Sequence, residues 1–143
     1  MADDTPVTLS LVAPLGTAAL EQVHGLVGEA CERSSTSMID HIRFETAVIE
    51  IANNILEHSQ RTDPPSDEPR TFDVVLAADR DALTAEFRDD GRPAVIDFRA
   101  ISMPDAEAEA GRGLALALAA VDDVTHEHRD GLNIWRIVCR RTT

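Results

Sequence analysis

Three polar side chains recur at four-residue spacing in the stretch FETAVIEIANNILEHS, which runs from Phe44 to Ser59: Glu50, Asn54 and His58. In a helix, side chains four residues apart lie about 40° apart around the axis, so these groups form one polar stripe. A carboxylate there can accept a proton from a hydroxyl group, and an amide oxygen can bind a hard ion such as Mg²⁺. The stripe is a candidate site, although a solvated helix face has the same pattern.

Two glycine-containing stretches further along the chain could complete such a site. In RDDGRP, Asp89 lies shortly before Gly91, and the stretch is also ideal chemistry for a plain turn. Backbone N–H groups at the start of a helix attract anions, and glycine lets phosphate oxygens approach them. The second stretch, GRGL, offers this chemistry with Gly111, Arg112, Gly113 and Leu114. A flexible junction between a loop and a helix would have the same composition.

The elements that hold these groups can be predicted from the spacing of apolar residues. We expect a strand at residues 7–13, a helix capped by Thr17, and a second helix from near Ser37 to His58 or Ser59. A hairpin at residues 71–90, a long loop at 91–110, a helix from Gly113 and a hairpin that turns at Asp130 and Gly131 should follow. Four apolar residues of the second helix should face the core: Phe44, Val48, Ile51 and Ile55.

This order of elements predicts the fold class. It indicates an α+β fold in which helices cover one face of a mostly antiparallel sheet, a two-layer α/β sandwich. With 143 residues, the chain fits a single domain, residues 1–143. A long loop that enters a helix through glycines, approximately residues 91–112, is expected to serve as a lid over the site.

Composition and charge narrow the classes of function. The net charge is −13, and all 13 basic residues are arginines spread thinly along the chain, so nucleic-acid backbones and anionic membranes are disfavoured partners. No N-terminal run resembles a signal peptide, and the longest apolar run, Leu114 to Val121, is far shorter than the roughly 20 residues of a membrane span. Cys31 and Cys139 lie in apolar segments and should fill the core. We therefore expect a cytoplasmic protein.

The three stretches occur in the order and at the separations of the N, G1 and G2 boxes of the GHKL ATPase superfamily, named for gyrase, the heat-shock chaperone, histidine kinases and the mismatch-repair ATPase. The sequence resembles this superfamily, which has the Bergerat-type ATP-binding fold. It is most similar to the anti-sigma factor serine kinases. The resemblance covers nearly the whole chain, and the combination of boxes is much more specific than any one motif.

The resemblance implies roles for the residues of the first two boxes. Glu50 would be the catalytic base that polarises the acceptor hydroxyl or a water, and Asn54 would be the protein ligand of a magnesium ion that bridges the nucleotide phosphates. Asp89 would accept a hydrogen bond from the adenine amino group, and Gly91 would let the base approach closely. Guanine presents a carbonyl at that position, and a carboxylate cannot pair with it. His58 would be a possible supporting residue.

In the third box, the resemblance places Gly111, Arg112 and Gly113 at the ATP phosphates and includes Leu114 in the ATP-binding segment. The sequence also departs from the family pattern. Ala110 stands where related kinases often have a glycine, and PAVID replaces the usual Pro-Phe-Asp-Pro after the G1 glycine. Three acidic residues lie near the expected triphosphate and would weaken nucleotide affinity unless they point to solvent: Asp105, Glu107 and Glu109.

The resemblance implies an anti-sigma factor that is also an ATP- and Mg-dependent serine/threonine kinase. Its partners would be a sigma factor, which it sequesters, and a STAS-domain anti-anti-sigma protein, which it phosphorylates; a homodimer is common in such proteins. One alternative is a non-catalytic binding module of the same fold, either nucleotide-dependent or nucleotide-independent. A detached histidine-kinase catalytic domain is a weaker alternative, because no phospho-acceptor helix precedes the predicted fold.

Overall fold

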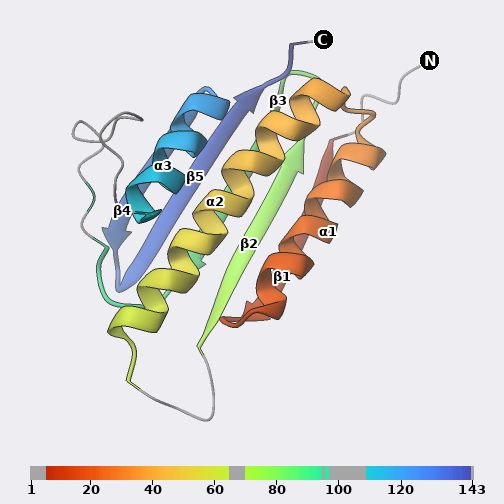
Figure 1. Cartoon of the computed structure of the whole chain (residues 1–143). Coiled ribbons are helices and arrows are strands. Elements are labelled where there is room, and N and C mark those ends of the chain that lie inside the picture. The colour runs from red at the N-terminus through yellow and green to blue at the C-terminus, as the bar shows by residue number, and fades with distance from the viewer. Residues whose placement is uncertain (1–5, 65–69, 95, 97–108, 143) are drawn as a thin grey trace.

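The computed structural model describes residues 6–64, 70–94, 96 and 109–142. These residues form a two-layer α+β structure, with three helices packed on one face of a five-stranded sheet (Figure 1). The elements follow one another in the chain as β1 (Val7–Pro14), α1 (Ala18–Arg33), α2 (Met38–Thr62), β2 (Thr71–Ala78), β3 (Ala82–Asp89), α3 (Glu109–Ala120), β4 (Asp123–Arg129) and β5 (Leu132–Arg140). The predicted fold class and order of elements are confirmed.

The sheet has the strand order β1-β2-β3-β5-β4, and every neighbouring pair is antiparallel. Strand β5 enters between β3 and β4, so it places residues from the end of the chain beside the G1 stretch. In this register Asp89, the last residue of β3, lies opposite Asn133, the second residue of β5. The β4–β5 turn is the predicted one, because Asp130 and Gly131 both have positive φ angles, 55° and 78°, as a type I′ hairpin requires.

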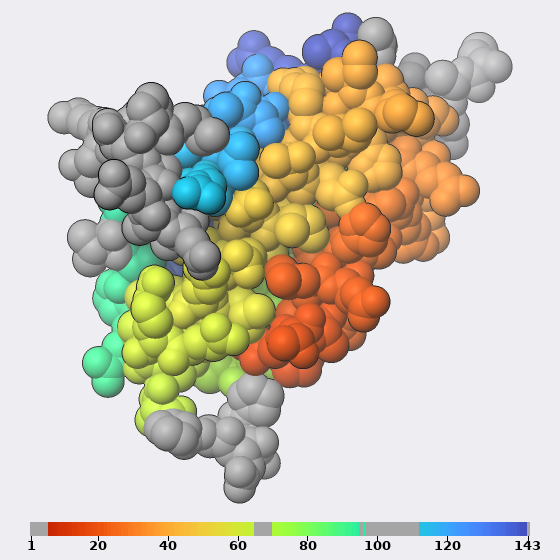
Figure 2. Space-filling view, in the orientation of Figure 1, coloured from red at the N-terminus to blue at the C-terminus, as the bar shows by residue number. Residues whose placement is uncertain are grey.

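Helix α2 runs across the middle of the sheet between α1 and α3, and Figure 2 shows this helical face of the molecule. It begins near Ser37, as predicted, and the Ser37 hydroxyl caps it by accepting a hydrogen bond from the backbone N–H of Asp40. It ends at Thr62, beyond the predicted end near His58 and Ser59. Asp63 has an extended backbone there because it precedes Pro64, and a proline disfavours helical geometry in the residue before it.

The cap predicted for α1 is wrong. Thr17 has helical backbone angles and its side chain makes no capping hydrogen bond. Instead, the backbone carbonyl of Gly16 accepts a hydrogen bond from the N–H of Ala19 at 3.0 Å. The chain therefore enters this helix through a backbone turn, which leaves the Thr17 hydroxyl outside the cap.

The core lies between the helices and the sheet. Its largest fully buried side chains are Trp135, Phe44, Phe87 and Ile51. All four apolar residues of α2 that the sequence placed in the core are buried, whereas Glu50 and Asn54 are half-buried on another side of the helix. Cys31 and Cys139 are buried, unpaired members of this core, as predicted, and burial raises the pKa of Cys31 to about 11. Among the helices of the described ranges, none is long and apolar enough to cross a membrane.

Candidate functional site

The N-box helix and the third helix meet at Glu50. One carboxylate oxygen of Glu50, Oε2, lies so close to the Cα of Gly113 that a Cβ atom at that position would overlap it. A side chain at position 113 would displace the flexible end of Glu50, so Gly113 permits this approach, a role that the sequence did not indicate. The structure therefore brings the candidate base of α2 against the GRGL segment.

The sequence predicted that the last helix begins within the GRGL segment, at Gly113. In the structure, this segment lies inside α3. The helix begins at Glu109, four residues before Gly113. The first N–H groups of a helix have no partner within it, so the amide of Gly111, the third residue of α3, belongs to this free set, whereas that of Gly113 is positioned for an intrahelical bond. The Arg112 side chain is exposed, and Leu114 is buried at 3% exposure as a core residue. The segment therefore combines a helix start with a packing contact.

Asp89 is a buried carboxylate, 5% exposed, at the end of β3. Its Oδ1 atom accepts hydrogen bonds from the backbone N–H of Gly91 at 2.9 Å and from the side-chain amide of Asn133 at 3.3 Å. No donor in the described part of the chain is hydrogen-bonded to Oδ2 of Asp89. Within the described residues the carboxylate is thus anchored through Oδ1, and Oδ2 is a candidate acceptor.

Asn133 is a site residue that the sequence analysis missed. It is 1% exposed, and besides Asp89 it donates hydrogen bonds to the backbone carbonyls of Gly91 at 3.3 Å and Arg92 at 2.9 Å. The signal was present in the sequence, because Asn133 stands among the mostly apolar residues of LNIWRIVC in β5. Such a buried amide must find partners, but the sequence does not say where they lie.

Arg70 is a second residue that was missed. It precedes β2, and its guanidinium group donates hydrogen bonds to Asp63 at 2.8 Å and Asp90 at 2.9 Å and lies 3.6 Å from Oδ1 of Asp89. Burial raises the pKa of Asp63, but the hydrogen bonds from Arg70 and Ser59 outweigh it and hold that pKa below its usual value.

Gly91 packs closely against the same arginine. A Cβ atom on Gly91 would lie only 2.7 Å from Nη2 of Arg70. Gly91 is therefore needed for close packing within the turn.

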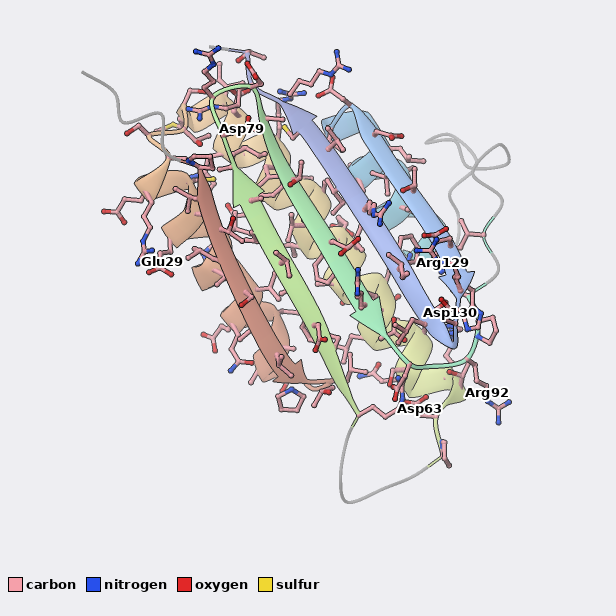
Figure 3. All side chains as sticks on the ribbon, turned by 180° about the vertical axis from the view of Figure 1, so that it is seen from behind. Glu29, Asp63, Asp79, Arg92, Arg129 and Asp130 are labelled. Carbon is pink, nitrogen blue, oxygen red and sulfur yellow. The ribbon has the colours of Figure 1, made fainter. Side chains whose placement is uncertain are left out.

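His58, near the end of α2, contacts the same turn, and its supporting role stays a prediction. Its Nε2 atom is 2.8 Å from the backbone carbonyl of Arg92, the residue that follows the G1 glycine. Figure 3 shows Asp63 and Arg92 at one end of the sheet, near the Asp130 turn, with Asp79 at the opposite end. The end of α2 is thus tied to the segment that leads out of β3.

The predicted lid falls largely outside the described residues. Positions 95 and 97–108 of the approximate range 91–112 are not described, and neither are the side chains of Glu109 and Ala110. The expectations for Asp105 and Glu107, and for Val95 and Asp97 of the PAVID segment, therefore lie outside the described residues. The site that can be described consists of the stripe on α2, the turn after β3 and the first turns of α3.

A family profile described as the histidine kinase-like ATPase domain matches residues 13–139. The match includes all three candidate boxes and most of the chain. The chain belongs to the histidine kinase-like ATPase domain family. The GHKL resemblance is thereby confirmed, and for this ATPase domain it implies that the site binds a nucleotide. No curated protein sequence matches this ATPase domain.

Two solved structures are similar to this ATPase domain in fold. One contains the RsbU and RsbW domains of a Mycobacterium tuberculosis protein, with a TM-score of 0.68 and 18% identity over 94% of this chain and 32% of that one. The other is the SiaB–SiaC complex from Pseudomonas aeruginosa, with a TM-score of 0.60 and 14% identity over 92% of this chain and 89% of that one. This ATPase domain thus spans about a third of the mycobacterial chain, and identities this low show a shared fold alone.

Proposed function

We propose that this chain is an ATP-dependent serine/threonine kinase that also acts as an anti-sigma factor. Its phosphate acceptor would be a serine or threonine on a STAS-domain anti-anti-sigma protein, and its second partner a sigma factor. Residues 1–143 would act as one ATPase domain, with the lid at approximately residues 91–112. The observation that carries the kinase part is the contact between the carboxylate of Glu50 and Gly113, because it joins a proton acceptor to the segment proposed to hold phosphates.

In the proposed reaction, the oxygen of the acceptor hydroxyl attacks the γ-phosphorus of ATP, and Glu50 accepts the proton of that hydroxyl. A bond forms between the hydroxyl oxygen and phosphorus, the bond between phosphorus and the β,γ-bridging oxygen breaks, and ADP leaves. Most of the rate in such a transfer comes from positioning and charge, and proton acceptance contributes a further factor. The free amides at the start of α3 would hold the phosphates, with the exposed side chain of Arg112 adding positive charge.

The residues present fit a magnesium ion held mainly by the nucleotide. No group of three or more His, Cys, Asp or Glu side chains within the described residues could hold a metal by itself. Asn54 is half-buried one helical turn after Glu50 and offers a hard amide oxygen, which suits an ion that takes one or two protein ligands and keeps phosphates and water. The bound ion would neutralise phosphate charge during transfer.

The base-binding end is proposed to lie at Asp89. Its Oδ2 atom would accept a hydrogen bond from the adenine amino group, while Oδ1 stays bound to the turn. His58 would support the site by holding the carbonyl of Arg92. The resulting pocket would run from the end of β3, past Asn54, to the first turns of α3.

The partners are proposed from the family resemblance together with the two similar structures. One of those structures contains an RsbW domain, and the other is a complex of two proteins. A fold shared with such proteins supports a regulatory kinase that works by exchanging protein partners. A homodimer is part of the same proposal.

The kinase proposal can be tested by following phosphate transfer from γ-labelled ATP to purified STAS-domain proteins. The wild type should label its cognate partner on a serine or threonine, and Glu50→Gln should lower the rate about 100-fold with little change in ATP affinity. Glu57→Gln is the matched control, because Glu57 lies on the same helix but is bonded to Asn53 at 3.2 Å. ATP binding without transfer, and with sigma sequestration intact in Glu50→Gln, would favour the non-catalytic binding module instead.

A further inference from the structure

The side chain of Asn133 makes hydrogen bonds through both its amide nitrogen and its amide oxygen. Its amide nitrogen faces three acceptors, Oδ1 of Asp89 and the carbonyls of Gly91 and Arg92. Its amide oxygen faces two nitrogens, the backbone N–H of Ala94 at 3.1 Å and a ring nitrogen described below. One side chain therefore holds the G1 turn on both sides.

The orientation of this amide is decided by its neighbours. The backbone N–H of Ala94 can only donate, so the atom of Asn133 that faces it must be the oxygen. Nε2 of His126 lies 3.0 Å from the same oxygen, so it carries the proton and donates as well. The His126 ring is held against Trp135, with ring centroids 4.5 Å apart. If the amide were flipped, its NH2 group would face the N–H of Ala94, and its oxygen would face the carbonyls of Gly91 and Arg92.

The fixed orientation has a consequence for Asp89. The amide N–H of Asn133 and the backbone N–H of Gly91 both donate to Oδ1, so this oxygen of the carboxylate is fixed in place. Its rotation is also restricted by these two bonds. The remaining oxygen, Oδ2, therefore presents a hydrogen-bond acceptor in a fixed place.

We propose that Asn133 sets the base specificity of the nucleotide site by holding Asp89 as a fixed acceptor that selects 6-aminopurines against 6-oxopurines. The inference rests on the proposed function, since it assumes that a nucleotide base reaches Asp89. A 6-amino group donates to Oδ2, whereas a 6-oxo group would place its lone pairs against the carboxylate. Asn133 does not touch the base in this scheme, so it is a positioning residue.

Asn133→Asp tests the inference most directly, because it changes one atom type and little volume. A second carboxyl group would then lie about 3.3 Å from Oδ1 of Asp89, and two carboxyl groups so close share a proton. The pair would gain an O–H donor and lose part of its acceptor character. ATP should bind more weakly, and a 6-oxopurine nucleotide should lose less affinity or gain some.

The experiment measures dissociation constants of the purified full chain for ATP and for ITP, which carries a 6-oxo group in place of the amino group. The wild type should prefer ATP by at least about tenfold, and Asn133→Asp should lower this ratio by about tenfold or more. Asn133→Ser, which removes the amide without adding charge, should also lower the ratio and decides the matter if the aspartate variant does not fold. Asn53→Asp on α2 is the control for the same chemical change, and its ratio should equal that of the wild type.

Two groups of outcomes would overturn the inference. The first leaves the proposed nucleotide site intact, and the second refutes it as well. If the Asn133 variants bind ATP and ITP equally more weakly, with the ratio unchanged, the residue is only structural. A wild type that binds both nucleotides equally well also refutes the role of Asn133 while leaving nucleotide binding intact. If the wild type binds neither nucleotide, the proposed function itself fails, and the inference fails with it.

Discussion

Asp40 and Asp89 are both buried aspartates, and they lie near opposite ends of β5. At one end, Asp40 is 0% exposed and uses both oxygens, since Oδ1 accepts hydrogen bonds from Arg43 and the Thr142 hydroxyl, and Oδ2 accepts one from the Thr142 N–H. At the other end, the described contacts of Asp89 all involve Oδ1. A saturated carboxylate stabilises the fold, whereas a half-saturated one can still bind a ligand.

The surroundings of the two carboxylates support the same distinction. The Arg43 side chain that binds Asp40 also reaches the backbone carbonyls of Ala120 and Arg140, so one cluster joins α2, α3 and β5. Asp89 instead lies beside a turn that continues into the predicted lid. The first cluster joins three elements of the fold, whereas the second joins the end of β3 to its own turn and to β5.

The largest expected effect is on stability and comes from Asp40→Ala. This change removes three hydrogen bonds and leaves Arg43 and Thr142 with fewer partners, so the free energy of unfolding should fall by about 2–4 kcal/mol in a urea titration. Asp81→Asn is a control at an exposed aspartate and should change stability by less than about 0.5 kcal/mol. A stable Asp40→Ala variant would mean that saturation of a carboxylate does not identify a structural role here.

Asp89→Asn should produce the reverse pattern. The amide keeps an oxygen for the turn but presents a donor or a weaker acceptor to the base, so ATP affinity should fall by about 10- to 100-fold, as measured by calorimetry. The free energy of unfolding should change by less than about 1 kcal/mol. Asp90→Asn is the neighbouring control, because the side chain of Asp90 is 67% exposed. Equal losses of affinity in both variants would contradict a specific role for Asp89.

Gly113→Ala should separate catalysis from stability at the other end of the site. The added Cβ would displace the flexible end of Glu50, so phosphate transfer should slow by about tenfold. Stability should change by less than about 1 kcal/mol, because alanine favours a helix and the displaced group can turn away. Gly28→Ala in α1, where a Cβ meets nothing within 4 Å, is the matched control. Unchanged transfer in Gly113→Ala would remove Glu50 from the reaction.

The smallest expected effect is the acid dependence of stability that Asp40 contributes. Burial raises the pKa of this carboxyl group, but the hydrogen bonds from Thr142 and Arg43 outweigh it and lower the pKa below its usual value. A group with a lowered folded-state pKa stabilises the fold above its unfolded pKa of about 3.9, and this stabilisation is lost as the pH falls through the folded-state value. Urea titrations between about pH 6 and pH 3 should show a shallower loss in Asp40→Asn than in the wild type. Identical slopes would show that other groups set the acid limit.

Much of the fold and part of the site could be predicted from sequence. The order of elements, the start of α2 near Ser37 and the Asp130–Gly131 turn follow from short-range chemistry, and the structure confirms them. The Thr17 cap and the start of the last helix were wrong, because a backbone turn can replace a side-chain cap and a helix can begin before its glycines. Both errors lie at helix ends, where local signals are weakest.

By itself, the sequence determined the three boxes. It also determined that Glu50 and Asn54 lie on one side of their helix, because residues four apart on a helix share a side whatever packs against it. Only the tertiary structure decided which groups complete them. Asn133 lies 44 residues from Asp89 in the chain, and their contact exists because β5 pairs with β3. The approach of Gly113 to Glu50 likewise depends on how α3 packs against α2. A buried amide or a glycine signals that a partner is required, but the partner is set by strand order and helix packing.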